Sequence, residues 1–186
     1  MGAMMDALPT LETPRLSLRP MTPEDAQNVV RWRNSHHVKR MMAAERDAPL
    51  TIEEHLEWFD RTRANRIDYV IELRAIGRPI GTVSLDWRAS PQGARCAESG
   101  RILGVADLQG QGYSKEAASC WMDFAFTQLL LDCVFARTRA DNRANIAIGQ
   151  ALGFKRRAWP EWLERPEGSW VFTVLTKQMW DVRTGS

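Results

Sequence analysis

The segment DLQGQGYSKEA, residues 107–117, restricts the possible folds of this 186-residue chain more than any other. It follows an apolar run typical of a strand and precedes the 3.6-residue periodicity of an amphipathic helix. Gly110 and Gly112 at this junction leave backbone N–H groups bare. The first N–H groups of a helix lack partners and its dipole is positive there, so a strand, a glycine loop and a helix together favour anion binding.

The usual phosphate-binding fingerprints do not fit this loop. Lys115 stands where G-x-G-x-x-G requires its third glycine, and the segment does not match G-x-x-x-x-G-K-[ST]. Taken alone, the loop is therefore as well explained by a turn that needs two glycines as by an anion site.

Periodicity and capping residues predict alternating strands and helices along the rest of the chain. Strands are expected over 15–21, 68–74, 79–87, 97–106, 133–139 and 168–180, the last paired with a short strand near 154–159. Helices are expected over 22–34, 51–63, 117–129 and 141–152. This order predicts one α/β domain over residues 1–186, with an ordered core of about 13–180 and a largely antiparallel N-terminal half.

Composition excludes several classes of partner. A net charge of +2 is too small to indicate nucleic acid. Cys96, Cys120 and Cys133 form no closely spaced pair, so we expect reduced thiols rather than a disulfide or a zinc site. No apolar run approaches the roughly 18–20 residues that span a bilayer. The N-terminal MGAMMDALPT lacks the features of a signal peptide. We therefore expect a cytoplasmic protein with no membrane partner.

Two motifs in the second half of the chain carry a family resemblance. QGQGYS matches Q/R-x-x-G-x-G/A, with serine in the last place, and DNRANIAIGQALGF contains a matching asparagine pair and a final Gly-Phe. The matching residues are Gln109, Gly112, Ser114, Asn142, Asn145, Gly153 and Phe154. In their order and spacing these motifs resemble the GNAT superfamily of N-acetyltransferases, over about residues 13–180. The WRN and GR segments are similar to the branch containing ribosomal-protein N-terminal and amino-sugar N-acetyltransferases.

The resemblance implies a fold and a cofactor. The fold is a mixed central sheet with splayed central strands and about four flanking helices. The cofactor is acetyl-CoA, with no metal. Its pyrophosphate would bind the backbone amides of Gln109, Gly110, Gln111, Gly112, Tyr113 and Ser114.

The resemblance also places the pantetheine arm of the cofactor. The arm would lie beside Leu103, Gly104 and Val105, with Asn142 and Asn145 nearby. A bulge near Gly104 would splay the strand, since glycine inside a strand often marks an irregularity. The amide near Val105 would polarise the thioester carbonyl.

Acetyl transfer to an amine needs a base and benefits from an acid. An alkyl amine with a pKa near 10 must lose a proton before it attacks. Glu98, on the strand that enters the loop, matches the base of related histone acetyltransferases, although a strand glutamate is equally often only solvated. Gly149 replaces the family's usual tyrosine acid, so the acid is unassigned. Asn145 can donate a hydrogen bond to sulfur without delivering a proton.

Aromatic and acidic residues predict where the acceptor binds. Tryptophan faces stack on sugars and hold cations, and glutamates attract a positive amine. The candidates are Trp32, Arg33, Asn34, Trp58, Trp87, Trp162 and Glu164. They favour an amino sugar or an aminoglycoside-like amine. A protein N-terminus is the alternative substrate, and a non-catalytic acyl-CoA sensor is an alternative of another class. The protein would be a monomer or a homodimer.

Overall fold

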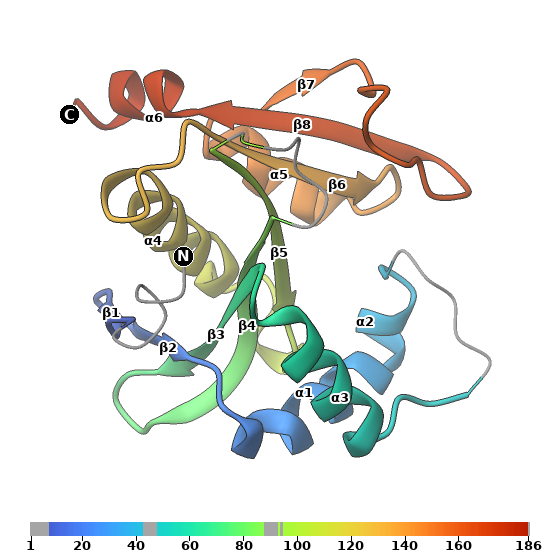
Figure 1. Ribbon diagram of the computed structural model, residues 1–186. Coiled ribbons are helices and arrows are strands. Elements are labelled where there is room, and N and C mark those ends of the chain that lie inside the picture. The colour runs from blue at the N-terminus through green and yellow to red at the C-terminus, as the bar shows by residue number, and fades with distance from the viewer. Residues whose placement is uncertain (1–7, 43–47, 88–92, 94, 186) are drawn as a thin grey trace.

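The computed structural model describes residues 8–42, 48–87, 93 and 95–185. Within them, one sheet has the strand order β1-β2-β3-β4-β5-β6-β8-β7 (Figure 1). The strands are β1 (Leu11–Glu12), β2 (Leu16–Pro20), β3 (Arg66–Leu73), β4 (Arg78–Asp86), β5 (Cys96–Leu103), β6 (Cys133–Arg139), β7 (Lys155–Arg157) and β8 (Trp170–Thr176). Most of the segment considered for a signal peptide, residues 1–7, lies outside this description.

The described helices are more numerous than the sequence predicted. They are α1 (Ala26–Asn34), α2 (His36–Lys39), α3 (Ile52–Thr62), α4 (Tyr113–Thr127), α5 (Arg143–Ala151) and α6 (Lys177–Thr184). About four helices were expected, and α2 and α6 are the two that pattern analysis missed. The strand predicted over 168–180 ends at Thr176, whose hydroxyl accepts a hydrogen bond from the Met179 amide at 3.2 Å. This N-cap starts α6, and a Lys177–Asp181 ion pair at 2.7 Å supports its first turn.

The sheet confirms the predicted mixed topology. Every pair of neighbouring strands is antiparallel except β5 and β6, which run parallel. These two strands pair only through Cys96–Cys133, Ala97–Val134 and Glu98–Phe135. Beyond Glu98 they diverge, and the separation is visible in Figure 1. The antiparallel N-terminal half and the splayed central strands are both confirmed.

Helices cover both faces of the sheet. The predicted apolar face of α4 is buried, and its Trp121 packs 4.8 Å from the ring of Tyr69 on β3. Side chains alternate along a strand, so the next residue, Val70, points to the opposite face. There it packs with Val29 and Trp32 of α1 in a second buried cluster. We call the face of the sheet that packs against α1 and α3 the acceptor-side face. The opposite face packs against α4 (Figure 1).

A disulfide joins Cys96 and Cys133, which face each other across the β5–β6 pair with Cα atoms 4.6 Å apart. The prediction of three reduced thiols is therefore wrong for two of them, while Cys120 is free and half-buried. This pair could not be predicted from the sequence, because the two cysteines are 37 residues apart and only the strand register brings them together. The bond ties the two strands together just before they diverge.

Candidate active site

The glycine loop presents a row of unpaired backbone amides at the start of α4. Gly110 and Gly112 have φ values of 75° and 84°, a region that glycine adopts at little cost. Gly112 is the N-cap of α4 and offers no side chain to the first turn. Among the described residues, no protein acceptor pairs with the N–H groups of residues 110–114. The loop therefore has the donors and the positive helix end that a phosphate-bearing ligand requires.

A cavity of about 440 Å³ lies where β5 and β6 diverge. Ser99 and Arg101 of β5 line one wall, and Ala136 and Thr138 of β6 line another. α4, which begins at the glycine loop, contributes Ala118 and Met122. The separation of the two strands thus produces a slot beside the helix whose N-terminus is unpaired.

The end of β5 differs from the prediction. The β4–β5 register is unbroken up to Leu103, and the Gly104 amide donates to the Ile80 carbonyl at 2.8 Å. The bulge predicted near Gly104 is therefore wrong, because the strands separate at Glu98, where β6 stops pairing. Gly104 is needed for close packing, since a Cβ there would lie 2.0 Å from Cγ of Trp32. The Val105 amide has no acceptor among the described residues, so its role as an oxyanion donor stays a prediction.

Of the two predicted asparagines, Asn145 of α5 lines the cavity, and Asn142 is the residue just before that helix. The side chain of Asn142 caps the helix by accepting from the Asn145 amide at 3.1 Å. Asn145 lines the cavity, accepts a hydrogen bond from Arg101 and donates to the Thr138 hydroxyl at 3.1 Å. Burial lowers the pKa of Arg101 to about 10. The slot therefore contains a desolvated cation held by Asn145, a feature that the sequence did not indicate.

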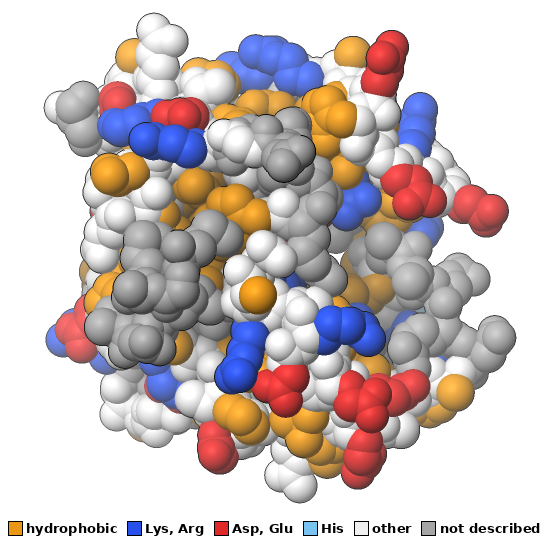
Figure 2. Space-filling view, in the orientation of Figure 1, with side chains coloured by type: hydrophobic (Ala, Val, Ile, Leu, Met, Phe, Trp, Pro, Cys, Tyr) orange, Lys and Arg blue, Asp and Glu red, His pale blue; other side chains and the backbone are white. Residues whose placement is uncertain are grey.

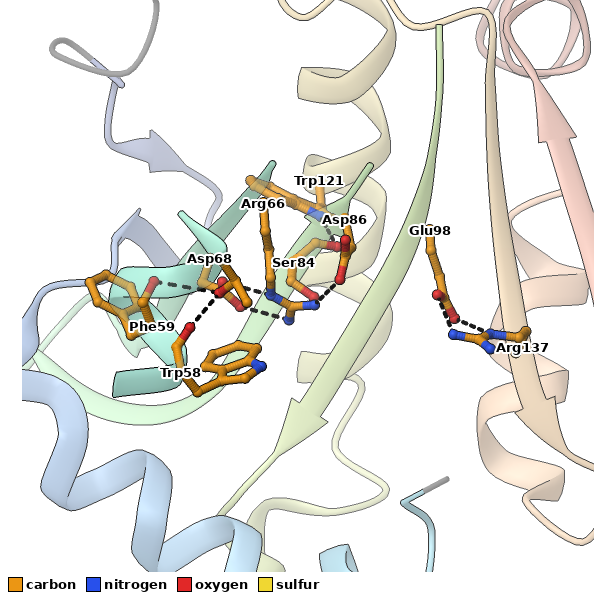
Figure 3. A network of polar contacts seen from close by, with 10 residues as sticks. Trp58, Phe59, Arg66, Asp68, Ser84, Asp86, Glu98, Trp121 and Arg137 are labelled. Carbon is orange, nitrogen blue, oxygen red and sulfur yellow. Dashed lines mark hydrogen bonds and ion pairs between the residues drawn. The ribbon is translucent and has the colours of Figure 1, made fainter. Parts of the chain in front are cut away.

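Glu98 lies on the acceptor-side face and forms a two-point ion pair with Arg137 of β6. Arg137 Nε donates to Glu98 Oε1 at 2.8 Å, and Nη2 donates to Oε2 at 2.7 Å (Figure 3). These hydrogen bonds raise the pKa of Arg137. Arg137 Nη1 also contacts the backbone carbonyl of Glu164 at 3.4 Å, in the loop before β8. The predicted base is thus tied to the loop that was predicted to bind the acceptor.

A second charge network, absent from the sequence predictions, lies on the same face. Arg66 of β3 bonds Asp68 through two nitrogens at 2.8 Å each, and it bonds Asp86 of β4 at 3.0 Å (Figure 3). Asp86 is directly opposite Glu98 in the β4–β5 register. The two networks together hold three carboxylates and two guanidinium groups, and with the guanidinium of nearby Arg33 this part of the face carries no net charge.

Trp58 of α3 lies beside the second network. Its ring centroid is 4.9 Å from the Arg66 guanidinium and 5.8 Å from that of Arg33, and the side chain is half-buried. Trp58 also stacks on His55 at 5.7 Å. The structure therefore brings two predicted acceptor residues, Trp58 and Arg33, together at the charged face.

Other predicted acceptor residues have packing roles. Trp32 is 3% exposed and covers Gly104, so its indole cannot reach an acceptor in this structure. The Asn34 side chain bonds both the amide and the carbonyl of Leu50 at 2.8 Å, joining the end of α1 to the entry of α3. Trp87 packs against the core that contains α4. The predicted acceptor contact of Trp32 is therefore wrong, because its side chain is buried, while those of Asn34 and Trp87 stay predictions.

The loop between β7 and β8 supplies the remaining predicted residues. Trp162 is 48% exposed and packs edge-on against Phe135 of β6 at 5.4 Å. Glu164 is exposed in the same loop. Figure 2 shows acidic side chains over the tip of this hairpin. An aromatic ring and carboxylates therefore border the face that holds Glu98.

The histidines do not form a metal site among the described residues. His55 is buried, and burial together with the nearby Arg33 cation lowers its pKa. Within the described ranges, no group of three or more His, Cys, Asp or Glu side chains is arranged to hold a metal ion. The described helices also include none with the length and apolarity to cross a bilayer.

Comparison with known proteins identifies the class defined by this fold and site. Residues 15–155 match the family model described as an acetyltransferase (GNAT) domain. The chain therefore belongs to the GNAT acetyltransferase family, and it is an N-acetyltransferase.

Three similar proteins illustrate the family. An uncharacterized N-acetyltransferase p20 from Bacillus licheniformis is 26% identical over 182 residues, or 91% of this chain and 97% of that protein. Spermidine N-acetyltransferase from Vibrio cholerae, solved with CoA and spermine, has a TM-score of 0.75 and 18% identity. The match spans 90% of this chain and 99% of that one. Ribosomal-protein-S5-alanine acetyltransferase from Vibrio fischeri has a TM-score of 0.73 and 20% identity, over 93% of this chain and 99% of that one.

Proposed function

We propose that this enzyme transfers the acetyl group of acetyl-CoA to the primary amine of a small cationic molecule. The observation that carries the proposal is the unpaired amide row of residues 110–114 at the head of α4, beside the cavity between β5 and β6. The similar spermidine acetyltransferase was solved with CoA, which supports the choice of cofactor.

The amides of the glycine loop, from Gln109 to Ser114, would hold the pyrophosphate of acetyl-CoA. The pantetheine arm would lie along Leu103, Gly104 and Val105, beside the diverging strands. The thioester would then reach the level of the β5–β6 separation, with Asn145 and its Arg101 partner on the α4 side. The bound cofactor supplies the acetyl group, and the Val105 amide would stabilise the oxyanion as a pre-placed donor.

Glu98 would take part in removing the proton of the amine. Both of its oxygens accept from Arg137, yet a carboxylate oxygen has a second lone pair. Glu98 therefore acts on the amine through those remaining positions or through an ordered water. Arg137 fixes the orientation of the carboxylate, since a bidentate guanidinium pair allows one geometry.

The departing thiolate has no tyrosine acid at Gly149, which lines the cavity. Asn145 donates one side-chain N–H to the Thr138 hydroxyl, and its second N–H can donate a hydrogen bond to sulfur. We assign it a cofactor-binding and thiolate-stabilising role, without proton transfer.

Neighbouring carboxylates on the acceptor-side face favour a cationic amine. Glu98 and Asp86 lie opposite each other in the β4–β5 register, and Trp162 adds an exposed ring at the border. An ammonium near a tryptophan and a carboxylate gains about 1–3 kcal/mol. These features support an amino sugar or an aminoglycoside-like amine. Acetylation of a protein N-terminus is the second candidate, favoured by the likeness to a ribosomal-protein acetyltransferase.

A panel of amines tests the proposed function. Purified protein is incubated with acetyl-CoA and either amino sugars, aminoglycosides, polyamines or peptides with a free N-terminal alanine or serine, and thiol release is followed. We expect turnover with a small cationic amine. Turnover with peptides alone would establish the second candidate. CoA binding without turnover of any amine would favour the non-catalytic sensor.

The acceptor loop gives a further prediction. Trp162→Ala and Glu164→Gln should each raise the KM for the acceptor, by roughly 5–150-fold for a contact worth about 1–3 kcal/mol. The KM for acetyl-CoA should stay close to the wild-type value, because the loop lies away from the glycine loop. Steady-state kinetics with each substrate varied in turn makes the distinction. An equal rise in both constants would indicate a folding defect and contradict the acceptor assignment.

A further inference from the structure

Arg15, in the connection between β1 and β2, contacts the glycine loop, although the two segments are far apart in the sequence. Its Nη1 donates to the Gln111 carbonyl at 3.0 Å, across 96 residues. Its guanidinium carbon lies 4.3 Å from the ring centroid of Tyr113, the first residue of α4. A Cβ at Gly112 would lie 3.3 Å from Nη2 of the same side chain. One arginine therefore contacts Gln111 and Tyr113 and lies close to the position of a side chain at Gly112, between them.

The same guanidinium neutralises an acidic residue at the head of α4. Glu116 lies in the first turn, where a carboxylate is favourable for the helix dipole but repels an anionic ligand. Arg15 Nε donates to Glu116 Oε2 at 2.6 Å, and the Arg15 amide and the Thr13 hydroxyl donate to Oε1 at 3.0 and 2.6 Å. Burial acts to raise the pKa of Glu116, but these hydrogen bonds outweigh it and lower the pKa. Glu116 is thus a permanent negative charge beside the loop.

We propose that Arg15 is a positioning residue for the cofactor, and this inference rests on the proposed binding of acetyl-CoA at the glycine loop. Arg15 fixes the Gln111 peptide and the Tyr113 ring, so that the amides of residues 110–114 converge on the pyrophosphate. It also offsets the negative charge of Glu116. Both effects act on the phosphate-bearing part of the ligand and leave the pantetheine arm untouched.

The solvent exposure of Arg15 indicates that the residue contributes little to folding. The Arg15 side chain is 45% exposed, and ion pairs at such positions contribute little to stability. Removing the guanidinium should therefore leave the fold intact while the loop loses its anchor and its counter-charge. The expected defect is in ligand binding.

The test compares ligands with and without a pyrophosphate. Arg15→Gln should weaken CoA binding, measured by calorimetry, by about tenfold or more, because one charge-assisted contact is lost and one carboxylate is left bare. The kcat/KM with S-acetylpantetheine, which has no pyrophosphate, should change less than twofold. Adding Glu116→Gln to Arg15→Gln should restore part of the CoA affinity, since it removes the repelling charge. Arg15→Lys should give an intermediate affinity, because it keeps the charge without the planar contacts.

Arg74→Gln is the matched control. Arg74 is an exposed arginine that pairs with Glu12 at 2.9 Å and contacts the Thr13 carbonyl, but it does not touch the glycine loop. Its CoA affinity should equal that of the wild type. The positioning role would be overturned if Arg15→Gln bound CoA as tightly as the wild type. It would also be overturned if the variant lost as much kcat/KM with S-acetylpantetheine as it lost CoA affinity. If the double variant recovered no CoA affinity, the charge argument would be overturned. Failure of the wild-type protein to bind CoA would instead overturn the proposed function, and this inference with it.

Discussion

Replacing Gly112 with valine should lower the affinity for CoA by at least about 100-fold. Gly112 has a φ of 84°, which a β-branched residue adopts only at a cost of a few kcal/mol. A Cβ would also press on Arg15 Nη2 at 3.3 Å. The peptide would rotate to relieve both strains and turn loop amides away from the pyrophosphate. Loss of two hydrogen bonds to a charged group, worth about 1.5–3 kcal/mol each, gives the expected factor. Calorimetry with CoA measures it.

Gly77→Val separates the effect on the site from general backbone strain. Gly77 also has a positive φ, 60°, but it lies in the β3–β4 turn and a Cβ there would meet no atom within 4 Å. This control should lose stability by a similar amount and keep its CoA affinity. Unchanged affinity in Gly112→Val would remove the glycine loop from the binding site. An equal loss in both variants would attribute the defect to the fold.

Features encoded by neighbouring residues were predictable from the sequence. The glycine loop, the buried face of α4 and the capped start of α3 depend on residues within one or two helical turns of one another. For α3, the Thr51 hydroxyl accepts from the Glu54 amide at 3.2 Å and the Glu54 carboxylate accepts from the Thr51 amide at 2.9 Å, which is the predicted capping box. Local chemistry of this kind does not need the tertiary fold.

Features that depend on strand register were not predictable. The Cys96–Cys133 disulfide and the Arg66–Asp86 contact both join residues that become neighbours only when particular strands pair in a particular register. A one-residue slip would move each side chain to the other face of the sheet. The Arg15–Glu116 contact depends likewise on how β2 lies beside α4.

Differences in burial between aromatic residues of the same type were also not predictable from the sequence. Trp32 and Trp162 both entered the acceptor set because tryptophan suits a cation or a sugar. Trp32 proved to be 3% exposed and Trp162 48% exposed. Gly104 leaves the space that the Trp32 indole fills. Because Gly104 and Trp32 lie far apart in the sequence, their contact could not be inferred from it.

The second large effect concerns the proton of the amine. At neutral pH an alkyl amine with a pKa near 10 is almost fully protonated, so the reaction needs a proton acceptor. Glu98 is the carboxylate of β5 at the level where β5 and β6 separate, and Arg137 holds both of its oxygens. In the proposed mechanism, the proton leaves through the free lone pairs of Glu98 or through a water bound to them. This role requires the carboxylate itself and not only its shape.

Glu98→Gln should therefore reduce turnover by about 100-fold at neutral pH, the lower range for loss of a general base. Part of the loss should be recovered toward pH 9, where more of the amine is already deprotonated, and the KM for acetyl-CoA should hardly change. The control is Glu72→Gln, because Glu72 forms a similar ion pair with Arg19 at 2.9 Å and is 16% exposed, against 18% for Glu98. Glu72 lies on β3 and takes no part in the proposed chemistry, so its variant should turn over normally. Rate profiles from pH 6 to 9 compare the three proteins, and a Glu98→Gln profile that follows the wild type throughout would exclude Glu98 from the mechanism.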